Sequence, residues 1–220
     1  MPSSTVENYL KELYSMQLKY EGDLVPLGKL AEAVGVTAGT ATIMIKRLAK
    51  NGLVSYEARS GAKLTDEGER KALNVLRRHR LIELFLVEVV KLDWSEVHEE
   101  AEILEHAISD HLLSKIDDML GNPTHDPHGD PIPAATGEIV KRRLISLADS
   151  KPGEVTVARI SDHSPQFLQF IHDKNLTPDT ILQVIARDDI AETITLSVNN
   201  QTIQLGTSAA DKIFVLDESV

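Results

Sequence analysis

The stretch PLGKLAEAVGVTAGTATIMIKRLAKN, Pro26–Asn51, combines two short helical patterns with a tight turn between them. The first pattern stops at Gly35, a residue type that commonly ends helices. Thr37 is a favourable N-cap, so a second helix is expected to follow it and to end before Gly52. Two short helices joined in this way are typical of a helix-turn-helix.

A β-hairpin wing is expected directly after this motif. Leu53–Glu57 and Ala62–Thr65 are short strand-like runs, and Arg59-Ser60-Gly61 between them suits a turn. A further helix over 7–19, with apolar residues near helical period, is predicted before the motif. The N-terminal third therefore predicts a winged helix-turn-helix.

The rest of the chain divides into a helical part and a β part. Long helices are expected from about Thr65 to Lys91 and from about Ser95 to Leu120, and a short helix is expected around 137–143. Short β-branched runs beyond residue 150 predict a small barrel of SH3 type. The runs are Glu154–Ile160, Thr180–Ala186, Thr193–Val198, Gln201–Leu205 and Lys212–Leu216.

The predicted fold class is mainly α with a small β component. A winged helix-turn-helix is expected over 1–70, a helical domain over 71–134, a linker over 135–150 and an SH3-like β-barrel over 151–220. A chain of 220 residues has room for these parts.

Composition and charge narrow the class of protein. The chain has no cysteine, which excludes a disulfide framework and thiolate sites for zinc or iron–sulfur clusters. No apolar run is long enough for a bilayer and no signal peptide pattern is present, so a soluble cytoplasmic protein with no membrane partner is expected. The net charge is -11, yet residues 1–65 carry eight Lys/Arg against six Asp/Glu. This asymmetry suits a protein that meets phosphate at one end and cations elsewhere.

The second helix of the motif has the character of a DNA-reading helix. It contains three basic residues and no acid, and its first turn is built from small and hydroxyl-bearing residues that can approach phosphates and thymine methyl groups in a major groove. Few base-reading side chains are available, so specificity is expected from methyl contacts and DNA shape. Winged helices also bind proteins, and this stretch alone leaves that alternative open. The candidate DNA-binding residues, two of them on the wing, are Thr37, Ala38, Gly39, Thr40, Thr42, Lys46, Arg47, Lys50, Arg59 and Lys63.

Histidine and glutamate recur at helical spacing along both long helices. His79 and Glu83 lie one turn apart on the first helix. On the second helix, four such residues fall within an arc of about 100°. Imidazole nitrogen and carboxylate oxygen suit Mn, Fe(II), Co, Ni or Zn, and the share of oxygen favours the harder ions. A solvated acidic helix face is the alternative. The four residues of the second helix are His98, Glu102, Glu105 and His106.

This ordered set of motifs resembles the diphtheria-toxin-repressor and manganese-transport-regulator family over essentially the whole chain. The resemblance implies a DNA-binding domain, a helical domain that binds metal and dimerises, and an SH3-like domain similar to FeoA. The motifs that follow the winged helix-turn-helix are Arg78–Glu83, Leu92-Asp93, Val97–Glu102, Glu105-His106 and Asp126–Pro133.

The resemblance also implies two metal sites. The primary, activating site is carried over to Asn8, Glu102, Glu105 and His106. The ancillary site is carried over to His79, Glu83 and His98, with His163 and Gln166 from the SH3-like domain. Some manganese-type members also take ligands from the loop that here contains Asp126 and His128.

Three positions depart from the pattern of one or another branch of the family. Glu102 stands where iron-responsive members have Cys, and hard oxygen in place of sulfur favours Mn(II). Asn8 stands where members have Met or Asp; its amide oxygen brings no charge, which predicts weaker affinity or dependence on the ancillary site. Lys11 stands where short manganese regulators have Glu, so their paired-metal centre is not expected.

The expected function is that of a metal-dependent transcriptional repressor, a homodimer that binds a pseudo-palindromic double-stranded operator. Mn(II) is the expected metal, with Fe(II) as the alternative and other divalent transition metals binding in vitro. Bound metal would hold the two DNA-binding domains of the dimer at the spacing of successive major grooves. A metal-independent regulator and a metal-dependent hydrolase are the alternatives from other classes. The dimer face is expected along Leu84, Phe85, Leu86, Val89, Ile103, Leu104, Ala107 and Ile108.

Overall fold

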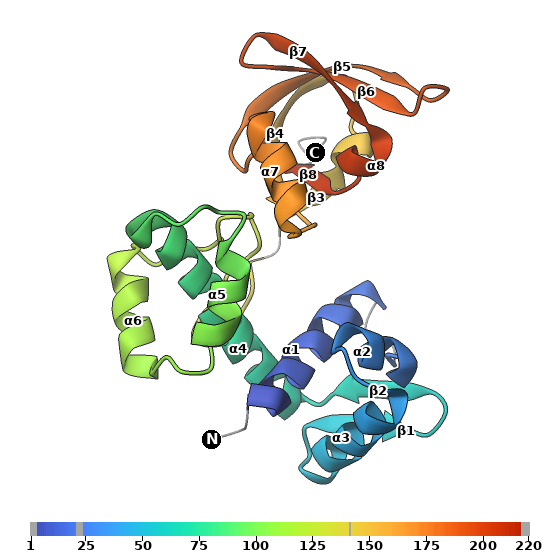
Figure 1. Ribbon diagram of the computed structural model, residues 1–220, viewed down its shortest axis with the longest axis vertical. Helices are drawn as coiled ribbons and strands as arrows, with labels where there is room; N and C mark the ends of the chain where they lie inside the picture. The colour runs from blue at the N-terminus through green and yellow to red at the C-terminus, as the bar shows by residue number, and fades with distance from the viewer. Residues whose placement is uncertain (1–3, 21–23, 141, 217–220) are drawn as a thin grey trace. The chain divides into compact units, whose positions relative to one another are not determined.

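The computed structural model describes residues 4–20, 24–140 and 142–216, and they form two compact units (Figure 1). Unit 1 comprises the described residues up to 79, together with 104–109 and 133–138. Unit 2 comprises 80–103, 110–132 and the described residues from 139 onward. Helix α4, Asp66–Phe85, begins in unit 1 and ends in unit 2.

Unit 1 contains the predicted winged helix-turn-helix. Its helices are α1 (Ser4–Lys19), α2 (Leu27–Ala33) and α3 (Ala38–Lys50), and its wing is the antiparallel pair β1 (Val54–Glu57) and β2 (Gly61–Leu64). Apolar side chains at helical spacing on α1 and α3 meet in one core because each helix turns a single apolar face inward. The fully buried members include Tyr9, Leu10, Leu13, Ile45 and Leu48.

Two local contacts explain where these elements begin and how they join. Thr37 caps α3 as predicted, because its Oγ1 accepts the backbone N–H of Thr40 at 3.2 Å. The side chain of Gln17 on α1 accepts the backbone N–H of Leu64 on β2 at 2.8 Å. Helix α1 is therefore fastened directly to the wing of the motif.

The helical segment differs from the sequence prediction in one main respect. The first long helix is present, because α4 continues as the π-helical turn η1 (Leu86–Val90) and ends where Lys91 takes a left-handed conformation with φ 66°. The single helix predicted over 95–120 is wrong: α5 (Val97–Leu104) and α6 (Asp110–Met119) are separate. The break at 105–109 belongs to a segment that packs in unit 1, and this packing overrides local helix propensity.

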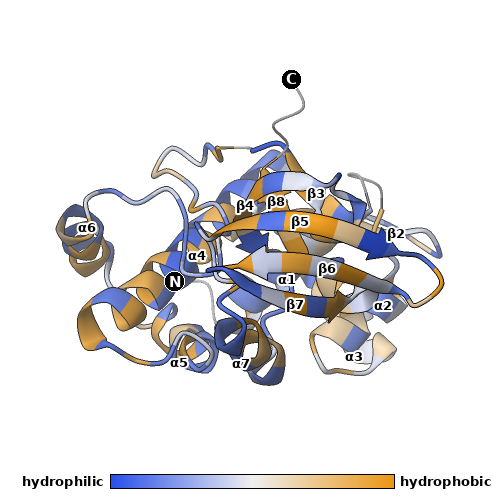
Figure 2. Ribbon diagram, turned by 90° about the horizontal axis from the view of Figure 1, so that it is seen from above, coloured by the Kyte–Doolittle hydropathy of each residue, from blue (hydrophilic) through white to orange (hydrophobic). Residues whose placement is uncertain are grey.

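The C-terminal part of unit 2 is an antiparallel sheet of SH3 type, in the strand order β3-β8-β4-β5-β6-β7. In Figure 2 hydrophobic and hydrophilic colours both occur on these strands, and along Thr193–Val198 every second residue is buried, which is the pattern of a strand with one buried face. One apolar core lies beneath them. The strands are β3 (Leu144–Ser146), β4 (Gly153–Ile160), β5 (Ile181–Asp188), β6 (Thr193–Val198), β7 (Gln201–Gly206) and β8 (Ile213–Leu216).

All five predicted strands are present, and the sequence prediction missed smaller elements. Strand β3 pairs with β8, and the short helices η2 (Leu147–Asp149), α7 (Pro165–Asp173) and α8 (Thr207–Ala210) lie between strands. The helix predicted around 137–143 is wrong, since the described residues of that segment are not helical. None of the described helices is long and apolar enough to cross a membrane.

Candidate metal centre and DNA-binding surface

Helix α3 presents an exposed, basic face that begins at its cap. Every predicted DNA-binding residue is exposed except Thr42, which is half-buried and donates its hydroxyl to the carbonyl of Ala38 at 2.7 Å. Ile43 lies among them with 73% of its surface exposed. Sequence reasoning missed Ile43 because an isolated isoleucine in a helix predicts core. An exposed aliphatic side chain on this face suits contact with a thymine methyl group.

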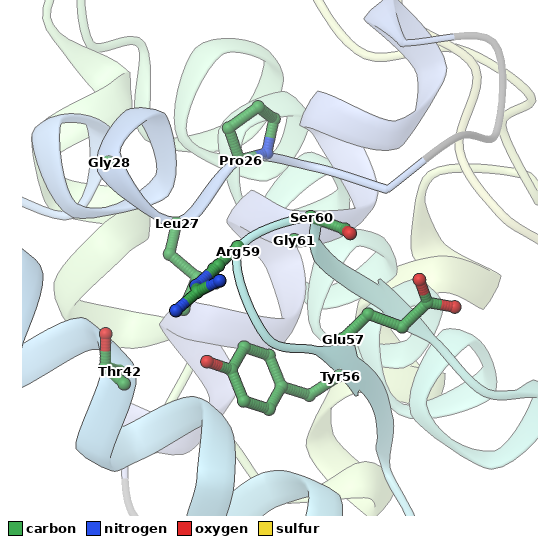
Figure 3. Close-up of a pocket in the computed structure, with 9 residues that line it drawn as sticks. All are labelled: Pro26, Leu27, Gly28, Thr42, Tyr56, Glu57, Arg59, Ser60 and Gly61. Carbon is green, nitrogen blue, oxygen red and sulfur yellow. The ribbon is translucent and has the colours of Figure 1, made fainter.

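A cavity of about 320 Å³ opens between the helix-turn-helix and the wing. Figure 3 shows the guanidinium of Arg59 and the hydroxyl of Tyr56 directed toward the side of α3 that carries Thr42. Arg59 adopts φ 69°, an uncommon conformation for a residue other than glycine, and this turn aims its side chain back from the tip of the wing. A guanidinium beside two hydroxyls is suited to hold a phosphate oxygen.

In unit 1, the predicted metal ligands gather where α1 meets the segment 104–109. Glu105 is fully buried, and its Oε2 lies 2.6 Å from His79 Nδ1. The Lys11 ammonium donates to both carboxylate oxygens of Glu105, at 2.7 and 2.9 Å. His106 Nε2 lies 3.4 Å from Glu105 Oε1. A carboxylate and two imidazoles therefore share one buried position with an ammonium.

Two buried atoms of unit 1 have the chemistry of metal ligands. Asn8 Oδ1 and His106 Nε2 are buried, and within the described residues neither has a hydrogen-bond partner. Glu7 fixes the tautomer of His106, because its Oε2 accepts from Nδ1 at 2.6 Å and so leaves the lone pair on Nε2. Buried polar atoms without partners are costly in a protein interior, and a cation that binds both would remove that cost.

Unit 2 contains a second cluster, formed by α4, α5 and the loop 126–130. Ligand atoms of Glu83, Asp126 and His128 all lie within 4.8 Å of one another, and all three residues are buried. His98 Nδ1 is 3.1 Å from Glu83 Oε1. The His163 ring stacks on the His128 ring with centroids 4.7 Å apart. Five of the predicted ancillary residues thus lie together in this unit.

The backbone of the loop 126–130 holds its side chains in place. Asp126 Oδ1 accepts the backbone N–H groups of His128 and Asp130, each at 2.9 Å, whereas Oδ2 has no hydrogen bond to any residue that the structure describes. Gly129 has φ 86°, and a Cβ there would collide with the carbonyl oxygen of Ala158 on β4. The loop can therefore lie against β4 only with glycine at this position.

Trp94 sets the tautomer of His128. His128 Nε2 donates to the Trp94 carbonyl at 3.0 Å, and Nδ1 is buried without a hydrogen bond among the described residues. Burial also lowers the pKa of His128, so the imidazole is neutral near pH 7 and Nδ1 carries a lone pair. The side chain of His128 is thus ready to act as a ligand.

Charge in the second cluster is balanced by arginine. Arg80 lies 3.6 Å from Asp126 Oδ2 and 3.5 Å from Asp130 Oδ1. Burial, with the nearby carboxylates of Asp130 and Glu83, raises the pKa of Asp126 to about 8. At His163, burial lowers the pKa, but the hydrogen bond to Asp130 and the negative charges of Asp130, Asp126 and Glu83 together outweigh burial, and the net pKa is raised. A cation bound by Asp126 would have to release the proton of that carboxyl group.

The remaining predicted ligands are described by the unit to which each belongs. Glu102 lies on α5 in unit 2, with its Oε1 3.8 Å from His98 Nε2. His79, assigned to the ancillary site, belongs to unit 1 and contacts Glu105 there. Gln166 is exposed on α7, and no hydrogen bond of the described residues involves its side chain. Sequence reasoning missed Glu7, although it lies one turn before Lys11 on the same helix.

Part of the predicted dimer face is exposed. Val89, Ile103, Leu104 and Ala107 are on the surface, whereas Leu86 is buried in its own unit. Exposed large apolar residues that sequence reasoning did not name extend the set along the helical segment. They are Val90, Leu112 and Met119.

Three family models match the chain in succession. An iron-dependent repressor N-terminal DNA-binding domain matches residues 1–62, and an iron-dependent repressor metal-binding and dimerisation domain matches 65–134. A FeoA domain matches residues 145–217.

Named relatives span most of the chain. The iron-dependent repressor IdeR of Mycobacterium leprae is 33% identical over 172 residues, 72% of this chain and 73% of the relative. The diphtheria toxin repressor of Corynebacterium diphtheriae is 28% identical over 214 residues, 91% of this chain and 92% of the relative. A solved manganese-dependent transcriptional repressor in complex with manganese is 42% identical, with a TM-score of 0.86, and covers 96% of this chain and 99% of its own.

Proposed function

We propose that this chain, which belongs to the diphtheria-toxin-repressor family of metal-dependent DNA-binding transcriptional repressors, takes manganese(II) as its activating metal. The members of this family are repressors rather than enzymes. The observation that carries the choice of metal is the donor set. The chain has no cysteine, and the buried ligand atoms are carboxylate or amide oxygens and imidazole nitrogens. Oxygen-rich sites without thiolate favour Mn(II) among the transition metals.

The activating site that we propose joins Asn8 of α1 to Glu105 and His106, with Glu102 as the fourth ligand inferred from the family resemblance. The assignment is supported by Asn8 Oδ1 and His106 Nε2, which are buried and have no hydrogen-bond partner among the described residues. Metal held by these residues would fasten α1 to the segment 104–109 within unit 1. Since Gln17 of α1 is hydrogen-bonded to the wing, bound metal would also stiffen the winged helix-turn-helix.

The ancillary site that we propose consists of Glu83, Asp126 and His128, with His98 and His163 beside them. The mutual distance of up to 4.8 Å between the first three supports it. The proposed site is confined to residues of unit 2, so His79, which belongs to unit 1, and the exposed Gln166 are left out of the wider set carried over from the family. Bound metal here would fasten α4 to the loop and to the barrel.

The operator that we propose is a pseudo-palindromic duplex read by a homodimer in the cytoplasm. Two copies of α3 would enter successive major grooves, with Ile43 and the small residues of its first turn near base edges. Lys46, Arg47 and Lys50 would meet phosphates. The exposed apolar residues of the helical segment, including Ile103 and Met119, supply the dimer contact that we propose. The domain boundaries that we propose are those predicted from the sequence.

Iron(II) is the second candidate metal, and the 33% identity to an iron-dependent repressor favours it. Operator binding distinguishes the two metals. Fluorescence anisotropy of a labelled promoter duplex would be followed at fixed salt under anaerobic conditions, first with chelator-stripped protein and then with Mn(II) or Fe(II). We expect Mn(II) to raise the affinity for the operator at least about tenfold, which corresponds to about 1.4 kcal/mol. Fe(II) should raise this affinity by a smaller factor.

The matched variants for this experiment are Glu105→Ala and Glu100→Ala. Glu105 is buried in the proposed site, whereas Glu100 is exposed on α5. The first should abolish the rise and the second should retain it. An equal affinity with and without any metal would contradict the proposed function and favour a metal-independent regulator.

A further inference from the structure

We propose that Lys11 is a tethered counter-cation that occupies the Glu105 carboxylate and competes with the activating metal for it. The inference rests on the proposed function, since it concerns the metal site that contains Glu105. It gives Lys11 a role in setting how much metal the protein requires.

The contacts of Glu105 carry the inference. The Lys11 ammonium lies 2.7 Å from Oε1 and 2.9 Å from Oε2, a symmetrical contact to both oxygens. His79 Nδ1 lies 2.6 Å from Oε2. The Glu105 side chain is fully buried and that of Lys11 is 12% exposed. Both oxygens that a metal would use are therefore already bonded to groups of the chain itself.

Two carboxylates of unit 1 have cationic neighbours before any metal binds. Glu7 contacts the same imidazole as Glu105, since its Oε2 accepts from His106 Nδ1 at 2.6 Å and Glu105 Oε1 lies 3.4 Å from His106 Nε2. Glu7 Oε1 is 4.0 Å from the guanidinium of Arg78. Glu105 is thus paired with Lys11, and Glu7 lies near Arg78. A dication added at Glu105 would stand a few ångströms from the Lys11 ammonium, where repulsion between like charges is strong in a buried setting. Binding of metal therefore requires the ammonium to leave.

The chemistry of lysine allows this exchange. Its ammonium is a compact charge on a flexible stem of four carbons, and it is strongly hydrated when it reaches water. The partial exposure of Lys11 gives the stem a route to solvent while the backbone of α1 stays in place. An arginine, with its planar fork, would hold a carboxylate more rigidly.

Opposite effects on stability and on affinity follow from this arrangement. A buried carboxylate without a counter-ion is strongly destabilising, so Lys11 stabilises the metal-stripped protein. The same contact opposes metal binding and raises the metal concentration that is needed for repression. A residue with a purely structural role would not produce both effects.

The test compares Lys11→Met with Lys19→Met in the full chain. Lys19 is an exposed residue of the same helix, so its substitution makes the same change in charge away from the site. Mn(II) binding would be measured by competition with a metal-sensitive dye at fixed pH and salt, for the binding event that Glu105→Ala removes. We expect Lys11→Met to bind Mn(II) at least about tenfold tighter and to unfold at a lower temperature than wild type when stripped of metal. Lys19→Met should do neither.

Unchanged or weaker Mn(II) binding by folded Lys11→Met would overturn the inference. If wild type shows no Glu105-dependent Mn(II) binding, the proposed function fails instead, and the two failures are thereby distinguished. Should metal-stripped Lys11→Met not fold, Lys11→Gln would replace it, because the amide keeps a donor without the charge. A double-mutant cycle of Lys11→Gln and Glu105→Gln on the stability of metal-stripped protein should then show coupling, and strict additivity would contradict the contact.

Discussion

The two clusters of candidate ligands are built from similar side chains, but their charges are balanced in different ways. In unit 1, the Lys11 ammonium sits directly on the carboxylate of Glu105. In unit 2, Arg80 stays at 3.5 Å or more from Asp126 and Asp130, and the ligand atoms of Glu83, Asp126 and His128 lie together. The second cluster is therefore assembled for a cation, whereas the first must be opened before a cation enters.

This difference suggests that the two proposed sites have different roles. A preassembled site binds with little rearrangement and so suits a structural role. A site that must exchange one internal contact for another couples binding to a change in the protein, and such coupling is what a sensor requires. The activating role would thus belong to the cluster of unit 1.

Gly129→Ala should break the second cluster with the largest effect on stability. The new Cβ would collide with the Ala158 carbonyl, and alanine disfavours φ 86°. We expect a loss of about 2 to 4 kcal/mol in unfolding free energy, from strain and displaced loop contacts. Urea denaturation of metal-stripped protein would measure it. Gly121→Ala, also at positive φ but in open space, is the control and should cost clearly less.

Ligand substitutions in the two clusters should differ in their effect on operator binding. Glu105→Ala should remove the metal-dependent rise in affinity entirely. His128→Gln should remove one equivalent of bound metal per chain and weaken the rise only in part, by about tenfold or less. Metal content by mass spectrometry and operator binding by anisotropy would be measured on the same samples. An abolished rise in His128→Gln with an intact rise in Glu105→Ala would reverse the assigned roles.

Trp94 should report the second cluster alone. It is the single tryptophan of the chain, and its ring centroid lies 5.3 Å from that of His128. Paramagnetic Mn(II) bound to His128 is expected to quench its fluorescence, and the signal should survive Glu105→Ala but not His128→Gln. Quenching that depends on Glu105 would show that the two sites do not bind separately.

The smallest predicted effect is on the stability of the SH3-like barrel, which contains His163. Asp162 lies 2.6 Å from the Lys212 ammonium, and although burial opposes it, bonding to Lys212 and Ser164 lowers the pKa of Asp162 to about 2. A carboxyl group whose pKa falls on folding contributes stability above its unfolded value, near 4, and this contribution is lost as pH falls toward 2. Asp162→Asn should cost about 1 kcal/mol at pH 7, since partial exposure screens the pair. Thermal unfolding should show a clearly smaller cost at pH 2.5 than at pH 7, because only part of the contribution remains at a pH between the two pKa values.

Much of the fold could be predicted from local patterns. The spacing of apolar residues and the cap at Thr37 define the helix-turn-helix, and alternating β-branched runs define the strands. The prediction of a single helix over 95–120 was wrong because residues 105–109 contain no glycine or proline to mark a break. That break follows from packing in unit 1, which no local pattern encodes. Helix α7 was missed although Pro165 at its start and buried Leu168 and Ile171 at helical spacing mark it.

The sequence predicted the residue types of the candidate site more completely than their arrangement in space. Histidine and glutamate at helical spacing identify the ligands, and the family resemblance orders them. The contact between Lys11 and Glu105 joins residues 94 positions apart, so only the folded chain reveals it. The ligand group of Glu83, Asp126 and His128 depends likewise on how a loop packs against a distant helix.

The most direct test of the account is reciprocity between metal and operator. Mn(II) affinity would be measured by dye competition in the presence and absence of saturating operator duplex, and operator affinity with and without saturating Mn(II). If metal and DNA binding are coupled in one equilibrium, the operator must tighten Mn(II) by the same factor by which Mn(II) tightens the operator, and we expect at least about tenfold for each. Mn(II) affinity that does not change with operator present would contradict metal-dependent DNA binding as the function of this chain.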